Sequence, residues 1–313
     1  MARRRSTRCM SKSNPNMRTG SSAGVGNAMP CVPGTHPTTG LSAGVGQVET
    51  ELGVPIPGII LPPEQWARTA LKKLPQDGPL DFAGLFGREA PLVLDIGCGN
   101  GRFILASALA RPELNHLGID ILPVVIRYAT RRANQRGLHH VRFAVCGGQE
   151  FLQRYVLPHT VAEIHIYHPQ PYSDAQKKER RLVTPGFLAL VHRALVPGGL
   201  LVLQTDNPAY WRYISAVVPQ LFEFHVQRGP WPDAPQGRTR REIMARRMGL
   251  RIFRAWGHPR PDLDESQLQD LIAKMPPPIF DAPRPRPRKK TRWRRPGARQ
   301  PARDVTPPDT SAG

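Results

Sequence analysis

The segment Leu92–Phe103, with the sequence LVLDIGCGNGRF, places three glycines at alternate positions directly after a run typical of a buried strand. Glycine adopts the left-handed backbone of tight turns and lets a ligand approach the main chain. The order Gly97-x-Gly99-x-Gly101 differs from the G-x-G-x-x-G of dinucleotide-binding folds, and Asp95 precedes it by two residues. A carboxylate there repels a pyrophosphate and favours an ammonium group. We therefore expect S-adenosylmethionine, with its amino-acid end against the turn.

Runs typical of strands alternate with helical stretches along the middle of the chain. The strand-like runs read PLVLDIG, HLGID, VRFAV, EIHIY and GLLVLQTD, and the helical stretches include RFILASALA, VVIRYATRRANQRG and GFLALVHRALVPGG. This alternation is the pattern of βαβ units, which build a parallel sheet covered by helices on both faces. The sequence therefore predicts an α/β fold with a doubly wound, mostly parallel sheet of the Rossmann-like type found in S-adenosylmethionine-dependent methyltransferases.

Polar and small residues follow the predicted strands at their carboxyl ends, where open parallel sheets bind their ligands. These positions are Asp95, Asp120, Gly147, His168 and Asp206. Asp120 ends the second predicted strand, where an acid accepts the ribose hydroxyls in nucleotide-binding folds. We expect Asp120 and Gly147 to line the cofactor site together with Asp95 and the glycine turn.

The chain is strongly basic, with a formal net charge of +20 over 313 residues. Most of the excess lies at the ends, because residues 1–49 carry +5, residues 50–283 carry +7 and residues 284–313 carry +8. This balance favours a polyanionic partner such as nucleic acid, and no run of about 20 apolar residues indicates a membrane span. The four cysteines form no C-x-x-C pair, so we expect no metal site and a reducing, cytoplasmic compartment.

Several motifs occur in a fixed order between about Leu80 and Arg260. They are LDFAGLFGREAPLVLDIGCGNGRF, HLGID, YHPQPYSDAQKKERRLV, LVLQTDNPAYW and TRRE. In this order they resemble the tRNA (guanine-N7)-methyltransferase family. The resemblance implies an enzyme that uses S-adenosylmethionine to methylate N7 of guanine in tRNA, at position 46 of the variable loop in tRNA numbering.

Composition divides the chain around this region. Residues 1–60 are rich in Gly, Ser and Pro and contain no acid before Glu49, so we expect a disordered basic extension. Residues 61–260 would form the methyltransferase domain. Residues 261–282, with an amphipathic piece near Asp264–Lys274, would form a short helical appendage. Residues 283–313, with ten Lys or Arg among prolines, read as a disordered tail that binds nucleic acid.

The loop HPQPY departs from the family pattern at its central position. The family carries P-D-P-W, and the resemblance implies that its Asp faces the cofactor and the target base. Pro169 and Pro171 match, whereas Gln170 replaces the Asp and Tyr172 replaces the Trp. Gln170 is therefore the expected catalytic residue. Guanine N7 attacks with an in-plane lone pair and needs no general base, so positioning would supply most of the rate.

Two further departures affect cofactor and phosphate binding. Gly147 and Gly148 stand where the resemblance implies an Asp–Ala pair that contacts the adenine. Asp174 stands where the family places a substrate-facing Lys. We expect Lys177 and Arg181, which follow closely, to hold tRNA phosphate in its place.

The last two motifs predict the residues that bind the substrate. Asp206 in QTDNPAYW has a carboxylate that can pair with N1–H and the exocyclic amine of guanine. Thr239 and Glu242 match the family's T-x-x-E, which implies a role at substrate and cofactor. Arg240 and Arg241 between them carry charge suited to a tRNA backbone.

Two other functions remain compatible with the sequence. The P-x-P-Y of the loop is similar to the N-P-P-Y of amino-group methyltransferases, although His168 is a poor substitute for the polar first residue. Alternatively, the lost motif residues and basic tails suit a non-catalytic RNA-binding module with a decayed pocket. Binding of S-adenosylmethionine distinguishes that module from either enzyme.

Overall fold

A computed structural model describes residues 43–71, 73–76 and 78–283 of the chain. The expectations for residues 1–42 and for the basic tail after residue 283 lie outside the described residues. No helix in the described ranges is long and apolar enough to cross a membrane. Cys98 and Cys146 carry free, buried thiols, whereas Cys9 and Cys31 are not among the residues described.

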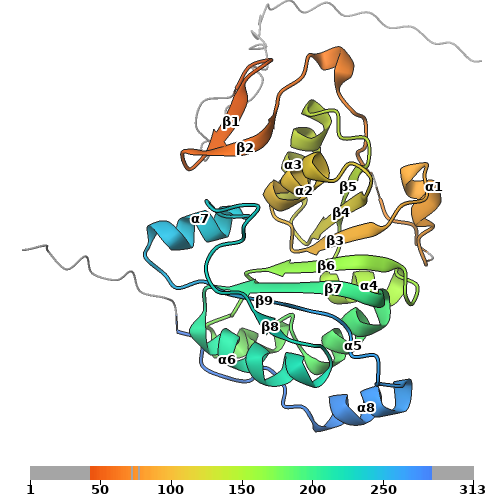
Figure 1. Ribbon diagram of the computed structural model, residues 1–313, viewed down its shortest axis with the longest axis vertical. Coiled ribbons are helices and arrows are strands. Elements are labelled where there is room, and N and C mark those ends of the chain that lie inside the picture. Colours follow the sequence, from red (N-terminus) through yellow and green to blue (C-terminus); the bar gives the residue numbers. More distant parts are fainter. Residues whose placement is uncertain (1–42, 72, 77, 284–313) are drawn as a thin grey trace, which may run out of the picture. The chain divides into compact units, whose positions relative to one another are not determined.

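The described part of the chain contains a seven-stranded sheet in the order β5-β4-β3-β6-β7-β9-β8 (Figure 1). Neighbours from β5 to β7 pair in parallel, whereas β9 pairs antiparallel with β7 and with β8. This confirms the predicted α/β fold with a mostly parallel sheet. The strands are β3 (Leu92–Ile96), β4 (Asn115–Asp120), β5 (Val141–Val145), β6 (Val161–Tyr167), β7 (Leu195–Thr205), β8 (His225–Val226) and β9 (Phe253–Gly257).

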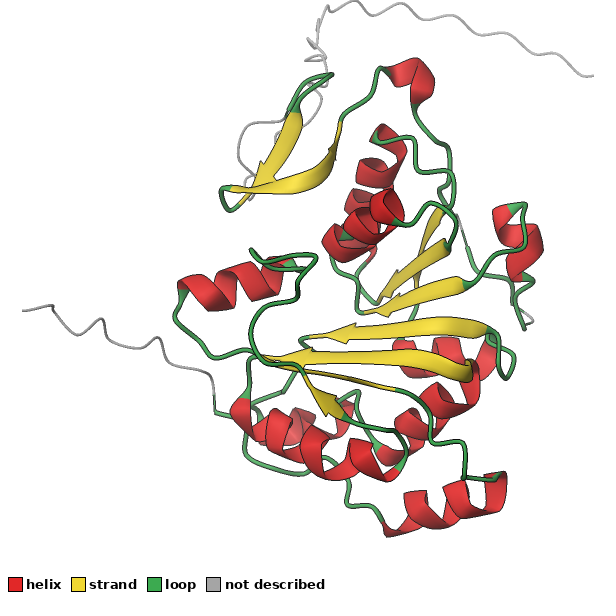
Figure 2. Cartoon of the chain, in the orientation of Figure 1, coloured by secondary structure: helices red, strands yellow, loops and turns green. Residues whose placement is uncertain are grey.

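Helices cover both faces of the sheet (Figure 2). In β3, Val93 packs into a buried cluster with α2 (Arg102–Ala110) and α3 (Pro123–Gln135). Its neighbours Leu94 and Ile96 point to the opposite face, because successive strand side chains alternate. The elements that contribute buried side chains on that face are α1 (Phe82–Phe86), α4 (Gly148–Arg154), α5 (Pro185–Ala194), α6 (Pro208–Val217) and α8 (Glu265–Lys274).

Residues 43–60 contradict the prediction of an extension that is disordered up to residue 60. Strands β1 (Val48–Glu51) and β2 (Val54–Ile59) form an antiparallel hairpin (Figure 1). Ile56 of this hairpin is fully buried in the cluster with α2 and α3. Glu49 accepts hydrogen bonds from Arg132 and Arg136 of the α3 region, at 2.7 and 3.4 Å. The hairpin therefore belongs to the folded domain.

Residues 261–282 also belong to this domain and are not an appendage. Asp264 begins α8 with a capping box, in which its side chain accepts from the Gln267 backbone N–H. Leu268 and Met275 are buried in the cluster that also holds α5 and α6. Because these apolar side chains complete one face of the core, the domain extends past residue 260.

We expect the free energy of unfolding to fall as the pH drops from 7 to 5. His116 in β4 is fully buried, and burial, followed by the nearby positive charges, lowers its pKa to about 3. The unfolded chain, with the ordinary histidine pKa, binds a proton in this window that the folded chain excludes. Stability is therefore complete above the unfolded pKa and is lost on acidification, by about 2 kcal/mol over these two pH units.

Chemical unfolding of the wild type and of His116→Gln at both pH values tests this expectation. The variant should lose less stability between pH 7 and pH 5, because the amide of Gln does not titrate. Equal losses in the two proteins would contradict the assignment of this effect to His116.

Candidate active site

The glycine turn between β3 and α2 leaves open space against the main chain. Gly97, Gly99 and Gly101 have φ values of 81°, 52° and 77°, in the left-handed region that favours glycine. A Cβ on Gly101 would lie 2.9 Å from both Ala129 and Phe143, so this glycine allows close packing of the turn. A Cβ on Gly97 or Gly99 would meet no described atom within 4 Å. These two positions form a cradle that a ligand can enter.

Asp95, near the end of β3, carries an unsatisfied carboxylate oxygen two residues before this turn. Its side chain is 1% exposed, and its Oδ1 has no hydrogen-bond partner among the described residues. Burial, and secondarily the charge of Asp120, raises the pKa of Asp95 well above its ordinary value. An ammonium group beside Asp95 would supply the missing donor and favour the ionised carboxylate.

Asp120, the last residue of β4, connects this strand to the glycine turn through hydrogen bonds. Its Oδ2 accepts the Gly99 N–H at 3.0 Å, and its Oδ1 accepts the Leu122 N–H at 3.0 Å. These bonds orient the carboxylate at the edge of the cradle and leave further lone pairs for ribose hydroxyls.

Gly147 lies where the surface beside Asp120 is open and apolar. A Cβ on Gly147 would meet only Ile121, at 4.0 Å among the described atoms, and Ile121 is 65% exposed. A Cβ on Gly148 would instead collide with the Ile96 side chain, which explains the absence of the alanine that the resemblance implied. The open surface at Ile121 suits an aromatic base such as adenine.

The residues of this edge fit S-adenosylmethionine as the cofactor. The bare turn at Gly97 and Gly99 admits its amino-acid end, and the orphaned Asp95 oxygen matches its ammonium group. Asp120 lies at the same edge and keeps lone pairs that can accept a hydroxyl group. No group of three or more His, Cys, Asp or Glu side chains within the described residues could hold a metal ion.

The loop after β6 places Gln170 at the surface. Gln170 is exposed, whereas Pro169 before it is buried. His168 and Tyr172 adopt positive φ values of 52° and 39°, which are uncommon for residues other than glycine. Backbone conformations of this kind persist where the surrounding structure holds them, and they concentrate at functional sites.

Arg181 holds this loop from inside, contrary to the prediction that it binds phosphate. Its side chain donates to the carbonyl oxygens of Pro171, Tyr172 and Pro278, at 2.6, 2.9 and 2.6 Å. The guanidinium also lies 3.8 Å from the centre of the Phe280 ring, and the residue is 2% exposed. With its donors engaged inside the protein, Arg181 cannot reach a tRNA backbone.

Lys177 remains at the surface, as a phosphate-binding side chain requires. It lies on the 3-10 turn η2 (Ala175–Arg180) and pairs with Asp174 at 3.3 Å. The Asp174 carboxylate also accepts the Gln176 backbone N–H, and this hydrogen bond, followed by Lys177, lowers the pKa of Asp174. Asp174 therefore caps η2, so the family lysine is replaced here by a structural residue.

His168 and Asp206 meet at the carboxyl ends of β6 and β7. Nδ1 of His168 lies 3.0 Å from Oδ1 of Asp206, and Arg241 donates to Oδ2 of Asp206 at 2.6 Å. His168 and Arg241 hold the pKa of Asp206 below its ordinary value, against the opposing effect of burial. The side chain of His168 is 4% exposed and that of Arg241 is 43% exposed. One partner is thus buried, whereas the other reaches solvent.

The hydrogen bond that the Trp231 indole donates to Gln204 determines the tautomer of His168. The Trp231 Nε1–H can only donate, and it bonds Oε1 of Gln204 at 2.6 Å. This fixes Nε2 of Gln204 as the donor to Nε2 of His168, at 2.8 Å. Nε2 of His168 is then the acceptor, so Nδ1 carries the hydrogen and donates it to Asp206.

The T-x-x-E residues adopt structural roles at the start of α7 (Arg240–Arg247). The Thr239 hydroxyl caps this helix by accepting the Glu242 N–H at 3.1 Å. Glu242 is fully buried and accepts from Gln204 and Arg254. In this conformation Glu242 orients its neighbours and does not face solvent, whereas Arg240 and Arg241 extend from the first turn of α7.

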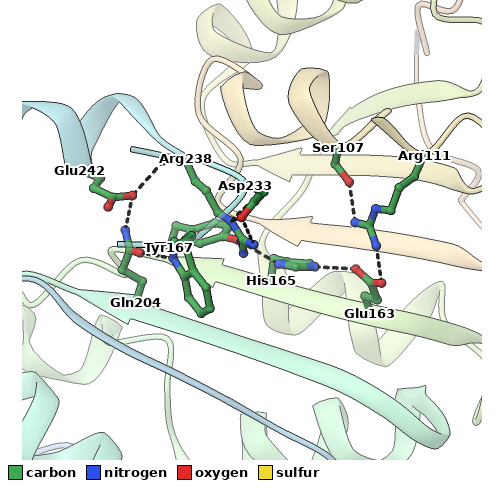
Figure 3. A network of polar contacts seen from close by, with 10 residues as sticks. Ser107, Arg111, Glu163, His165, Tyr167, Gln204, Asp233, Arg238 and Glu242 are labelled. Carbon is green, nitrogen blue, oxygen red and sulfur yellow. Dashed lines mark hydrogen bonds and ion pairs between the residues drawn. The ribbon is translucent and has the colours of Figure 1, made fainter. Parts of the chain in front are cut away.

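A buried row of polar side chains connects Gln204 and Glu242 with α2 (Figure 3). Glu163, His165 and Tyr167 occupy alternate positions of β6 and therefore share one face of the sheet. The Tyr167 hydroxyl accepts from Arg238 at 2.9 Å, and the Arg238 backbone N–H donates to Glu242. The row extends to Ser107 of α2 and to Arg111, the residue that follows this helix.

Sequence patterns predict the edge of the sheet that binds the ligand, but they do not predict the buried polar residues around Glu242. Gln204, Trp231, Arg238 and Arg254 were not recognised, because no motif links residues that meet only in the fold. Two signals were present in the sequence. Gln204 lies two residues before Asp206 at the end of a predicted strand, and Arg238 directly precedes TRRE.

Comparison with known proteins shows which family the chain is similar to. Residues 89–255 match the family described as "Putative methyltransferase". The tRNA (guanine-N(7)-)-methyltransferase of Halorhodospira halophila is 32% identical over 204 residues, which cover 65% of this chain and 83% of that protein. The enzyme of the same name from Rubrobacter xylanophilus is 34% identical over 182 residues, covering 54% of this chain and 77% of that protein.

Among solved structures, the 16S rRNA (adenine(1408)-N(1))-methyltransferase of Catenulisporales acidiphilia superposes with a TM-score of 0.43 at 17% identity. The match covers 62% of this chain and 96% of that one. The matched family spans more than half of the chain, and the Halorhodospira protein is covered over most of its length. The chain therefore belongs to the tRNA (guanine-N7)-methyltransferase family.

Proposed function

We propose that this protein transfers the methyl group of S-adenosylmethionine to N7 of guanine in cytoplasmic tRNA, at position 46 of the variable loop. The observation that carries the proposal is the open glycine cradle beside the orphaned Asp95 carboxylate, in a chain of this family.

The reaction needs orientation and no proton acceptor. S-adenosylmethionine supplies an activated methyl group on a positively charged sulfur. The N7 lone pair of guanine forms the new bond to the methyl carbon while the carbon–sulfur bond breaks, and its electron pair returns to sulfur. The products are neutral S-adenosylhomocysteine and cationic 7-methylguanine, and no proton leaves. The protein contributes alignment of the two reactants, which is worth several kcal/mol.

Asp206 is the proposed guanine-recognising residue. Its carboxylate lies at the cofactor edge, since β6 and β7 run parallel to β3 and end beside it. N1–H and the exocyclic amine of guanine are two donors that a carboxylate can accept, whereas adenine lacks the N1–H donor. In the structure, Arg241 occupies one oxygen of Asp206. We infer that guanine replaces Arg241, which then becomes free to pair with phosphate.

The surface around Asp206 suits a polyanion. Arg240 and Arg241 extend from the start of α7, and Lys177 is exposed on η2. Contacts of this kind position RNA without reading its sequence. We propose that these side chains hold the tRNA backbone. Gln170, exposed at the tip of its loop, is proposed to contact the target base through its amide.

Two observations weigh against the other functions. An amino-group methyltransferase needs a side chain at position 168 that holds the amine, but both ring nitrogens of His168 are engaged by Asp206 and Gln204. A decayed pocket would tolerate side chains in the cradle, yet Gly97 and Gly99 keep it open.

Nucleoside mass spectrometry tests the proposed reaction. We expect the purified protein, given S-adenosylmethionine and an unmodified tRNA transcript, to form 7-methylguanosine. A matched transcript with adenosine at position 46 should gain no methyl group. A methylated amino group in the product, or methylation of both transcripts, would contradict the proposal. Binding of tRNA with no binding of S-adenosylmethionine would instead identify a non-catalytic module.

A further inference from the structure

Glu51, at the end of β1, is a buried carboxylate outside every motif of the family. It is 2% exposed, although it lies in a segment whose composition predicted disorder. Its Oε1 accepts a hydrogen bond from Nδ2 of Asn100 at 2.6 Å. Asn100 lies between Gly99 and Gly101, inside the turn that forms the cofactor cradle. The hairpin thus contacts the cofactor site directly.

This contact adds a side-chain hydrogen bond to a turn that backbone hydrogen bonds also hold. The Gly99 N–H is held by Asp120, and the Gly101 N–H bonds the Cys98 carbonyl at 3.0 Å. Glycines on both sides give Asn100 unusually free backbone neighbours. A buried hydrogen bond to a carboxylate is stronger than one between neutral groups, so Glu51 is well suited to hold this residue.

Guanidinium groups from other elements lie near the Glu51 carboxylate, at ion-pair distances longer than a hydrogen bond. Oε1 lies 3.8 Å from Nη1 of Arg132 in α3 and 3.7 Å from Nη1 of Arg240 in α7. Arg102 of α2 fixes the hairpin by donating to the Pro55 carbonyl at 2.5 Å. Glu51 therefore joins the cofactor turn to the helix that carries the proposed tRNA-binding arginines.

Glu49, two residues earlier on the same strand, provides an internal comparison. Its carboxylate accepts from Arg132 and Arg136, and the structure gives it no contact with Asn100 or Arg240 among the described residues. Glu49 attaches the hairpin to α3. Glu51 additionally reaches the cradle.

We propose that Glu51 is a positioning residue of the cofactor site, which holds the glycine turn through Asn100 in the conformation that binds S-adenosylmethionine. The N-terminal hairpin is then a working part of the site. The inference rests on cofactor binding at the turn, as in the proposed function, and is independent of the choice of RNA or base.

The test measures S-adenosylmethionine binding by calorimetry, without RNA, in the full-length chain. We expect Glu51→Gln, which removes the charge of the acceptor, and Asn100→Ala, which removes the donor, each to weaken binding about tenfold. The double variant should be no weaker than either single variant, because both remove the same contact. Hydrogen exchange at residues 97–105 should also be faster in Glu51→Gln before cofactor is added.

Glu49→Gln is the matched control. It should lower the melting temperature, because it weakens the attachment to α3, and leave the dissociation constant within twofold of wild type. Wild-type affinity in Glu51→Gln would overturn the inference, and so would an equal loss of affinity in Glu49→Gln. Failure of the wild type to bind S-adenosylmethionine would instead contradict the proposed function.

Discussion

Replacing Asp95 by asparagine is expected to weaken the binding of S-adenosylmethionine tenfold or more while the protein becomes more stable. The carboxylate is 1% exposed, and its Oδ1 lacks a partner within the described chain. Losing a charge-assisted hydrogen bond costs about 1.5–3 kcal/mol. Removing an unpaired buried carboxylate also removes a desolvation penalty from the folded state, so the melting temperature should rise.

The raised pKa of Asp95 gives this expectation a second readout. Burial and the charge of Asp120 disfavour the ionised carboxylate in the free protein, whereas a bound ammonium group favours it. Cofactor binding should therefore release a proton at a pH below the raised pKa, and affinity should fall on acidification. Calorimetry in buffers with different ionisation enthalpies measures the released proton. Asp95→Asn should release none.

Asp262→Asn serves as the control, because this carboxylate is at the surface and pairs with Arg260. It should bind S-adenosylmethionine like the wild type. If Asp95→Asn also binds like the wild type, Asp95 does not hold the ammonium group. Asp120→Asn should likewise weaken binding about tenfold, since its carboxylate orients the Gly99 N–H and is placed for the ribose.

Replacing Asp206 by asparagine is expected to lower kcat/KM for tRNA by about 10–100-fold and to leave cofactor affinity unchanged. An amide presents a donor where guanine presents its own donors, and the charge is lost. A loss of this size corresponds to one charge-assisted hydrogen bond. Single-turnover methylation of tRNA and calorimetry with S-adenosylmethionine separate the two effects. Wild-type methylation by Asp206→Asn would show that guanine is recognised elsewhere.

Variants of His168 show whether Asp206 acts in the orientation seen in the structure. His168→Asn keeps an N–H donor near the position of Nδ1 and tolerates the positive φ of 52°, so it should retain most of the activity. His168→Gly tolerates this backbone but has no donor, and it should lose activity toward the level of Asp206→Asn. Equal activity in both variants would contradict a positioning role for His168.

The glycine turn and the sheet around it were predictable from the sequence because their causes are local. Left-handed backbone at Gly97, Gly99 and Gly101 favours glycine whatever surrounds it. Strand and helix periodicity in residues 92–205 reports burial on one face or both, and helical crossovers between successive strands then favour parallel pairing. Asp95 and Asp120 follow from this topology, since the carboxyl ends of parallel strands share one edge.

Composition predicted the wrong domain boundaries, because composition describes a segment without its tertiary contacts. Residues 43–60 continue a segment rich in Gly, Ser and Pro, and residues 261–282 match no motif of the family, yet Ile56 and Leu268 are buried. Each segment is stabilised by contacts with a surface that the rest of the chain provides. A composition average over the segment does not contain that surface.

What the sequence by itself determined is therefore the fold class, the cofactor turn and the edge where the ligand binds. Tertiary structure decided which charged side chains serve the substrate and which serve the fold. The sequence predicts Arg181 as a phosphate ligand, but in the fold it donates to the carbonyl of Pro278, 97 residues away. Glu49 likewise accepts from Arg132, 83 residues away. Distant segments of the chain set the environment of a charged group. A charged side chain that is buried beside hydrogen-bond or ion-pair partners stabilises the fold and does not bind a substrate at the surface.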